Sequence, residues 1–225
     1  DARLFFPQVE ELSQNWVVLV APPLVGGSIT QYATSLASQL PSRFSVVGHE
    51  LGACIAIELV RKFPERVDRL AIMSANALAD VPSDITQREH DIVAARSGPF
   101  PNCYSKTLAS RLSNPGLSGH VLTVLQDMAE ASNPQIYIDH IRAMQKRPDQ
   151  QSTLRRYNKP VGIICGRDDP IYPVRRIEFL AQLIPDAQLY VIDRAGHYPS
   201  LENPMDCTLA LSRWLKQPLV LHRTA

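Results

Sequence analysis

The sequence predicts an α/β fold in which a mostly parallel sheet is covered by helices on both of its faces. Short apolar runs rich in β-branched residues alternate along the chain with segments whose apolar residues recur every three to four positions. The apolar runs are nearly continuous, which is typical of parallel strands buried on both faces. Strands and helices that alternate in this way form right-handed βαβ units.

Five segments are expected to be strands and three to be helices of the main body. Each expected helix carries one apolar stripe, so each buries one side against the sheet. The expected strands are 16–21, 44–47, 67–73, 161–165 and 188–192, and the expected helices are 51–63, 174–184 and 203–215.

Residues 80–156 interrupt this alternation. The segment has no convincing strand, several helical stretches (85–95, 121–131 and 136–146) and six prolines, a pattern typical of short helices joined by turns. We therefore expect a helical cap insertion at 80–156, over the carboxyl edge of a sheet that is built from residues 1–79 and 157–225.

Composition limits the class of protein. A chain of 225 residues favours one domain, and 45% hydrophobic with 20% charged residues is close to the globular average. Its 23 Lys and Arg against 22 Asp and Glu leave a net charge of +1, dispersed along the chain, so neither a nucleic acid nor a membrane is an expected partner. No apolar run approaches the roughly 20 residues of a bilayer span, and a soluble protein is expected.

The N-terminus and the cysteines indicate the compartment and the bound groups to expect. The chain opens on a polar stretch rather than a signal peptide, and its four cysteines are far apart, so a cytoplasmic protein with reduced thiols is expected. No His or Cys spacing suggests a metal site, so no bound metal is expected. No feature of the sequence specifies the oligomeric state.

Three motifs follow expected strands and carry the chemistry. The strand at 44–47 runs into Gly48-His49-Glu50-Leu51-Gly52 and then directly into a helix, the context of a nucleophile elbow. The two glycines permit the tight turn that lifts Glu50 clear of the sheet. Gly166-Arg167-Asp168-Asp169 follows a later strand and Gly196-His197 the last one. All three motifs therefore lie at the sheet edge where open α/β folds bind ligands.

This order of nucleophile position, acid and histidine resembles that of the α/β-hydrolase family, in particular its small bacterial esterase-like members with a helical cap. The resemblance also rests on the segments 61–67, 166–173 and 201–204. It implies a hydrolase without a cofactor, acting on a small molecule. It assigns Glu50 to the nucleophile position, Asp169 to the orienting acid with Asp168 as the reserve, and His197 to the base. The backbone N–H of Leu51 becomes an oxyanion donor.

Glu50 departs from the family, whose esterase-like members carry Ser there. A carboxylate that attacks an ester carbonyl gives an anhydride, whereas at saturated carbon it can displace a leaving group. Glu50 can alternatively position or deprotonate a water beside His197, or simply cap the helix that follows. Two further hypotheses stay open: a catalytically silent relative that binds or assembles, and a cofactor-free oxygenase or lyase.

The N-terminal region allows two alignments with the family. In the favoured one, the helix at 1–13 precedes the strand at 16–21, and the central strand that carries the oxyanion loop is absent from this chain. In the other, the segment 16–21 is itself the central strand and residues 24–27 form the oxyanion loop. His49 is expected to pack into the sheet, and Phe100, Tyr104 and Tyr137 are expected to line an apolar substrate pocket.

Overall fold

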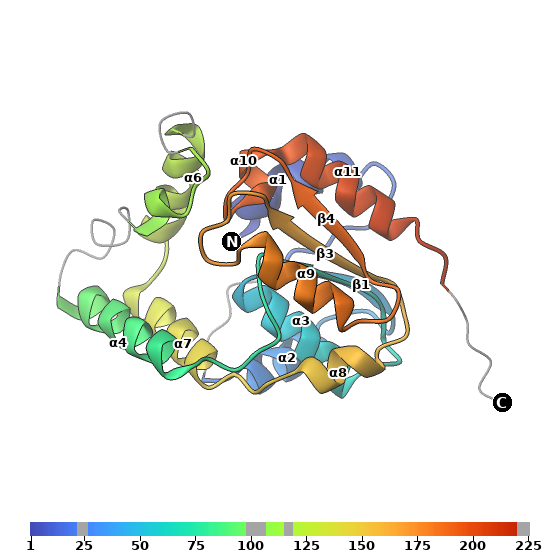
Figure 1. The fold of residues 1–225 in the computed structure, drawn as a ribbon, viewed down its shortest axis with the longest axis horizontal. Helices are drawn as coiled ribbons and strands as arrows, with labels where there is room; N and C mark the ends of the chain where they lie inside the picture. The colour runs from blue at the N-terminus through green and yellow to red at the C-terminus, as the bar shows by residue number, and fades with distance from the viewer. Residues whose placement is uncertain (22–26, 98–106, 115–118, 220–225) are drawn as a thin grey trace.

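The computed structural model describes residues 1–21, 27–97, 107–114 and 119–219 of the chain. Its elements confirm the expected alternation of strand and helix (Figure 1). The strands are β1 (Phe44–His49), β2 (Val67–Met73), β3 (Val161–Gly166) and β4 (Gln188–Ile192). The helices are η1 (Ala2–Phe5), α1 (Phe6–Leu12), α2 (Ile29–Ala37), α3 (Leu51–Lys62), α4 (Pro82–Ser97), α6 (Gly119–Glu130), α7 (Pro134–Gln145), α8 (Gln151–Arg156), α9 (Val174–Gln182), α10 (Pro199–Glu202) and α11 (Pro204–Leu215).

The four strands form one parallel sheet in the order β1-β2-β3-β4. The register pairs His49 with Met73 at the end of β1 and Gly166 with Ile192 at the end of β3. Because all four strands run the same way, the loops that follow them meet at one edge. This topology brings residues that are about 150 positions apart in the sequence into one site.

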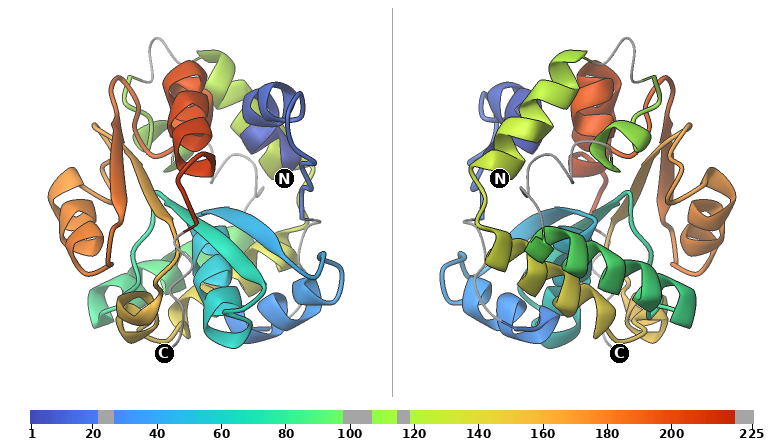
Figure 2. Two further views of the ribbon diagram at one scale, coloured as in Figure 1. Left: turned by 90° about the vertical axis from the view of Figure 1, so that its right-hand side faces the viewer. Right: turned by 90° about the vertical axis from the view of Figure 1, so that its left-hand side faces the viewer.

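Helices cover both faces of the sheet, as the sequence predicts (Figures 1 and 2). On one face, α2, α3, α8 and α9 contribute to a large apolar cluster that includes Ile57, Leu154 and Ile177. On the other face, α1 and α11 contribute Leu12 and Trp214 to a second cluster. Each large aliphatic side chain that is fully buried stabilises the fold by about 1.5–3 kcal/mol. The nearly continuous apolar strands are therefore explained by burial on both sides.

The prediction of a strand at Trp16–Ala21 is wrong, and so are both alignments insofar as they place a strand there. Residues 17–21 have no regular secondary structure and pair with no strand of the described sheet, in which β1 is an edge strand. Trp16 and Val18 pack against the α1–α11 cluster, whereas the exposed fraction of Val17 is 92%. Burial alternates only from Trp16 to Val18, since Leu19 and Val20 are both exposed, and a ladder requires a neighbour with free backbone groups at hydrogen-bonding distance. Of the alternative oxyanion loop at 24–27, only Gly27 lies within the described residues.

The insertion between β2 and β3 is helical where it is described. The helices α4 and α7 pack together through Ile92, Ala95, Ile138 and Ile141, and they lie to one side of the sheet (Figure 1). Helix α8, near the end of the predicted cap, instead packs on α3 of the main body. The division into a cap at 80–156 and a core remains a prediction.

A buried ion cluster joins the two segments that connect the sheet to these helices, one entering and one leaving the insertion. The carboxylate of Asp80 lies 2.6 Å from Nε of Arg88 and 2.6 Å from Nη1 of Arg147, and its side chain is fully buried. Nε of Arg147 also donates to the carbonyl oxygen of Leu78, at 2.8 Å. Asp80 lies where the chain enters the insertion and Arg147 lies where it leaves. The cluster therefore holds these two connecting segments together.

Within the described part of the chain, no helix combines the length and apolar character that a membrane span requires.

Candidate active site

Glu50 sits on a sharp turn between β1 and α3. Its backbone has φ 47° and ψ −107°, a left-handed conformation that costs a side-chain-bearing residue about 1–3 kcal/mol. The turn is held by its own N–H, which donates to the Met73 carbonyl at 3.1 Å, and by its carbonyl, which accepts from Ala53 at 3.1 Å. A Cβ at Gly48 would lie 2.2 Å from the backbone of Gly52, so the close approach of strand and helix requires glycine there. The local geometry is therefore that of the predicted elbow.

Asp169 lies in the loop after β3 with its side chain fully buried. Its Oδ1 atom accepts the backbone N–H groups of Ile171, at 2.8 Å, and of Tyr172, at 3.1 Å. Its Oδ2 atom remains to accept Nδ1 of His197, at 3.0 Å. The carboxylate is thus fixed by its own loop before it orients the ring. The neighbouring Asp168 is exposed.

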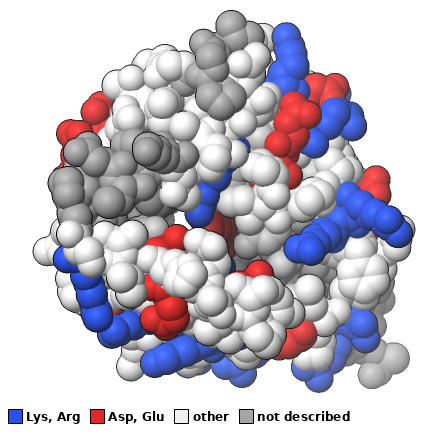
Figure 3. All heavy atoms as spheres, turned by 60° about the vertical axis from the view of Figure 1, so that its left-hand side comes forward, with Lys and Arg blue, Asp and Glu red and all other residues white. Residues whose placement is uncertain are grey.

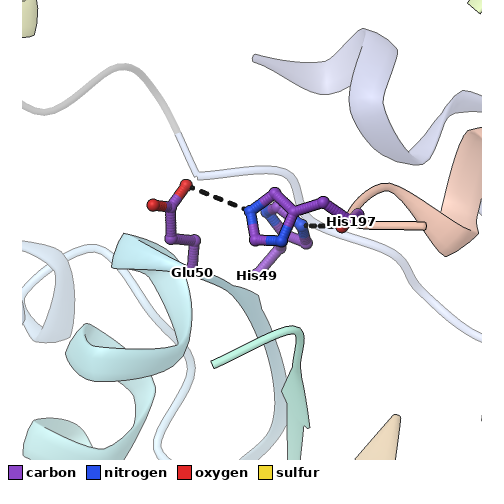
Figure 4. Close-up of side chains that lie close together, drawn as sticks. All are labelled: His49, Glu50 and His197. Atoms are coloured by element: carbon purple, nitrogen blue, oxygen red, sulfur yellow. Dashed lines mark hydrogen bonds and ion pairs between the residues drawn. The ribbon is translucent and has the colours of Figure 1, made fainter. Parts of the chain in front are cut away.

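His197 lies in the loop after β4, and its ring spans two carboxylates. Nδ1 faces Asp169, and Nε2 lies 3.5 Å from Oε2 of Glu50 (Figure 4). The backbone N–H of His197 donates to the carbonyl oxygen of Arg111, at 2.9 Å, and so the loop is tied to the segment 107–114. The distance from Nε2 to Oε2 of Glu50 exceeds that of a strong hydrogen bond. The two groups are therefore in contact but only weakly bonded.

The charges of these three groups reinforce one another. Burial favours the neutral form of His197, but the hydrogen bonds and charges of Asp169 and Glu50 outweigh it and raise the pKa of the imidazole. Burial likewise opposes ionisation of the carboxyls, but His197 lowers the pKa of Asp169, and His197 with Arg111 lowers that of Glu50 well below its usual range. The resting site therefore favours two carboxylates around a ring that takes up a proton readily.

Arg111 is a site residue that the sequence analysis missed. Its Nη1 atom lies 3.7 Å from Oε2 of Glu50, and the exposed fractions of the two side chains are 17% and 25%. It comes from the insertion and follows no strand, so no motif marks it. A hollow opens on the face shown in Figure 3, and both cationic and anionic side chains reach into it.

The ring of His49 lies against the ring of His197, with 4.8 Å between their centroids. The expectation that His49 packs into the sheet did not include this contact. The Nε2 atom of His49 contacts the carbonyl oxygen of His197 at 2.8 Å, and its ring stacks on Tyr198. Burial and the nearby His197 lower the pKa of His49 to about 4, so it is neutral near pH 7. His49, Glu50 and His197 offer atoms within 4.8 Å of one another, residue types that bind metal ions. However, Nε2 of His49 is already used by the carbonyl and a guanidinium lies beside Glu50, so this donor set fits an ion poorly.

The other predicted site residues have mixed outcomes. Leu51 is the first residue of α3, so its N–H has no acceptor within the helix. Its role as an oxyanion donor remains a prediction. Tyr137 lies in α7 and packs against the α4–α7 cluster, and its pocket role remains a prediction. Phe100 and Tyr104 lie outside the described residues.

Comparison with known proteins decides the family. The family model described as alpha/beta hydrolase fold matches residues 36–204, about three quarters of the chain. This chain belongs to the α/β-hydrolase fold family. Among curated α/β-hydrolase relatives, a pimeloyl-[acyl-carrier protein] methyl ester esterase of Aromatoleum aromaticum is 25% identical over 206 residues, covering 84% of this chain and 80% of that protein.

Solved structures agree. An esterase from Thermogutta terrifontis superposes with a TM-score of 0.84 at 25% identity, over 96% of this chain and 85% of that one. An enol-lactonase from Burkholderia xenovorans shares the fold, with a TM-score of 0.82 at 19% identity over 96% and 87% of the two chains. The expected fold and family are confirmed, and the relatives named as esterases place the chain among the hydrolases of this fold.

Proposed function

We propose that this α/β hydrolase cleaves a small organic ester without a cofactor, and that Glu50, His197 and Asp169 form its catalytic set. The observation that carries the proposal is the ring of His197, which lies between Oδ2 of Asp169 and Oε2 of Glu50 at 3.0 and 3.5 Å. The substrate class is suggested by the relatives, one named as a pimeloyl-[acyl-carrier protein] methyl ester esterase and one as an esterase.

The reaction that fits this set uses water as the nucleophile. Neutral His197 accepts a proton from a water held beside Glu50, and the water oxygen bonds to the ester carbonyl carbon. Asp169 fixes the tautomer of His197 and stabilises the imidazolium that forms. The tetrahedral intermediate then expels the alkoxide, which takes the proton back from His197. The products are a carboxylic acid and an alcohol.

Direct attack by Glu50 is the competing route. On an ester carbonyl it would form a mixed anhydride, which is more reactive than the ester it came from. On saturated carbon, Glu50 would instead displace the leaving group and form an enzyme ester that water later cleaves. The water route therefore suits esters, and the covalent route suits substrates with a leaving group on saturated carbon.

A panel of p-nitrophenyl esters from acetate to octanoate tests the activity. We expect turnover by the wild type and a loss of about 10³-fold or more in kcat/KM for His197→Gln. A wild type that hydrolyses none of these or the corresponding methyl esters would contradict the assignment.

Turnover in H2¹⁸O, followed by mass spectrometry of the peptide that contains Glu50, separates the two routes. The water route predicts ¹⁸O in the acid product and none in Glu50. Label in Glu50 would establish the covalent route instead.

The ion pairing of Glu50 favours one second candidate, a relative whose catalysis is silent. Its carboxylate lies beside the guanidinium of Arg111 and the ring of His197, an arrangement that also suits a purely structural site. Glu50→Ser distinguishes the candidates. If the wild type is inactive while Glu50→Ser hydrolyses p-nitrophenyl acetate, the fold retains an esterase site that Glu50 silences.

A further inference from the structure

The backbone of Arg111 is built into the loop that carries His197. Its carbonyl oxygen accepts the N–H of His197, and a Cβ at Gly196 would lie 2.6 Å from that same oxygen. The flanking Leu108 and Leu112 are buried in a cluster with Tyr198. Ser113, two residues on, donates its N–H to Oε2 of Glu202 at 2.7 Å. The backbone of Arg111 is therefore held against the loop that carries His197.

The guanidinium of Arg111 lies on the reacting side of Glu50. Nη1 is 3.7 Å from Oε2, too far for a hydrogen bond, and the same Oε2 atom faces Nε2 of His197. Both the Arg111 and Glu50 side chains are mostly buried, so their charges interact more strongly than they would at the surface.

Ester hydrolysis needs donors at this place. When an oxygen attacks the carbonyl carbon, negative charge develops on the carbonyl oxygen, two bonds away from the attacking atom. Donors at 2.7–3.1 Å from that oxyanion typically supply a large part of catalysis, at about 10²–10³ in kcat for each donor. Leu51 N–H is one available donor. In the described part of the chain, the strand that would precede an oxyanion loop is not found.

We propose that Arg111 is a catalytic residue of this hydrolase, whose guanidinium stabilises the oxyanion together with the N–H of Leu51. This inference rests on the proposed ester hydrolysis. A cation serves this purpose better than a second neutral donor here, because Glu50 places a negative charge beside the oxyanion. Arg111 both neutralises that charge and donates to the new one.

Kinetics of Arg111→Gln and Arg111→Lys on the best p-nitrophenyl ester test the role. We expect Arg111→Gln to lose about 10²–10³-fold in kcat with KM changed less than threefold, because the interaction forms only in the transition state. Arg111→Lys, which keeps the charge, should recover part of that loss. Arg43→Gln, which breaks an exposed ion pair with Asp68, is the matched control and should equal the wild type. A kcat unchanged in Arg111→Gln, or a loss equal in the Lys and Gln variants, would overturn the proposal.

A binding measurement keeps the inference testable even if no ester is cleaved. Methylphosphonate, a tetrahedral anion, is titrated calorimetrically into Glu50→Gln and into Glu50→Gln/Arg111→Gln, since removal of the Glu50 charge exposes the anion site. We expect binding to the first variant and a loss of at least tenfold in affinity in the second. Equal affinity in both folded variants would overturn the role of Arg111, whether or not the wild type is an esterase.

Discussion

Nδ1 of His197 lies 3.0 Å from Oδ2 of Asp169, and neither side chain is exposed to solvent. Because the other oxygen of Asp169 is held by two backbone N–H groups, the carboxylate cannot turn away and the ring keeps Nε2 towards Glu50. Orientation of the base is therefore a property of the loop after β3.

Replacement of Asp169 by Asn tests this orientation. An amide can donate to Nδ1 and so favour the wrong tautomer of His197, and we expect kcat to fall by about 10²–10⁴-fold. Asp168→Asn is the matched control, because Asp168 adjoins Asp169 but its side chain is exposed. Esterase kinetics of the two variants check the prediction, which fails if both lose activity equally.

The pH dependence of kcat/KM follows from the raised pKa of His197. The base must be neutral to accept a proton, so the rate should rise with pH through a pKa above the ordinary histidine value of about 6.5. Glu50→Gln removes one negative charge from the ring, so the imidazolium is less stable and the rise should move to lower pH. The NMR titration of the His197 ring measures the same shift without a substrate. Coincident titration curves for the two proteins would disprove the coupling.

Substitution by alanine at the two glycines of the elbow should change the free energy of unfolding by different amounts. At Gly48 the added methyl group would lie 2.2 Å from the backbone of Gly52, whereas at Gly52 it would meet no atom within 4 Å. We expect Gly48→Ala to lower the free energy of unfolding by about 1–3 kcal/mol or to prevent folding. Gly52→Ala should stay within about 1 kcal/mol of the wild type. Urea denaturation followed by circular dichroism distinguishes them, and a Gly48→Ala variant as stable as Gly52→Ala would contradict the close approach of strand and helix at Gly48.

The buried cluster at the base of the insertion should contribute strongly to stability. Asp80→Asn leaves the guanidinium groups of Arg88 and Arg147 without their carboxylate, and loss of one partner of a buried pair typically costs about 3–5 kcal/mol. Asp193→Asn, which removes the exposed partner of Arg167, should change the unfolding free energy little. Urea denaturation of both variants provides the comparison. A small change in the unfolding free energy of Asp80→Asn would mean that the two connecting segments are held by apolar packing alone.

Much of the fold and site could be predicted because the signals are local. The glycines at 48 and 52 mark the elbow, and the bounds of β2 and β4 match the expected strands at 67–73 and 188–192. Parallel strands then bring Glu50, Asp169 and His197 to one edge, although 147 residues separate the first from the last. The parallel topology brings these residues together. It could be expected because consecutive strands are usually neighbours and their crossover connections are right-handed.

Two features could not be predicted because they depend on distant contacts. The segment at 16–21 has the apolar character of a strand, but strand formation needs a partner strand that local sequence does not reveal. Arg111 is placed by the packing of Leu108 and Leu112 against Tyr198 and by a backbone bond to His197. Neither contact can be recognised from the local sequence alone, because Tyr198 and His197 lie more than 80 positions later in the chain.

A double-mutant cycle on Glu50 and His197 tests the central claim most directly. The measurement is kcat/KM for one p-nitrophenyl ester with the wild type, Glu50→Gln, His197→Gln and the double variant. If the two side chains act as one catalytic unit, the double variant should be no slower than the slower single variant. Losses that multiply in the double variant, or single variants as active as the wild type, would contradict the account.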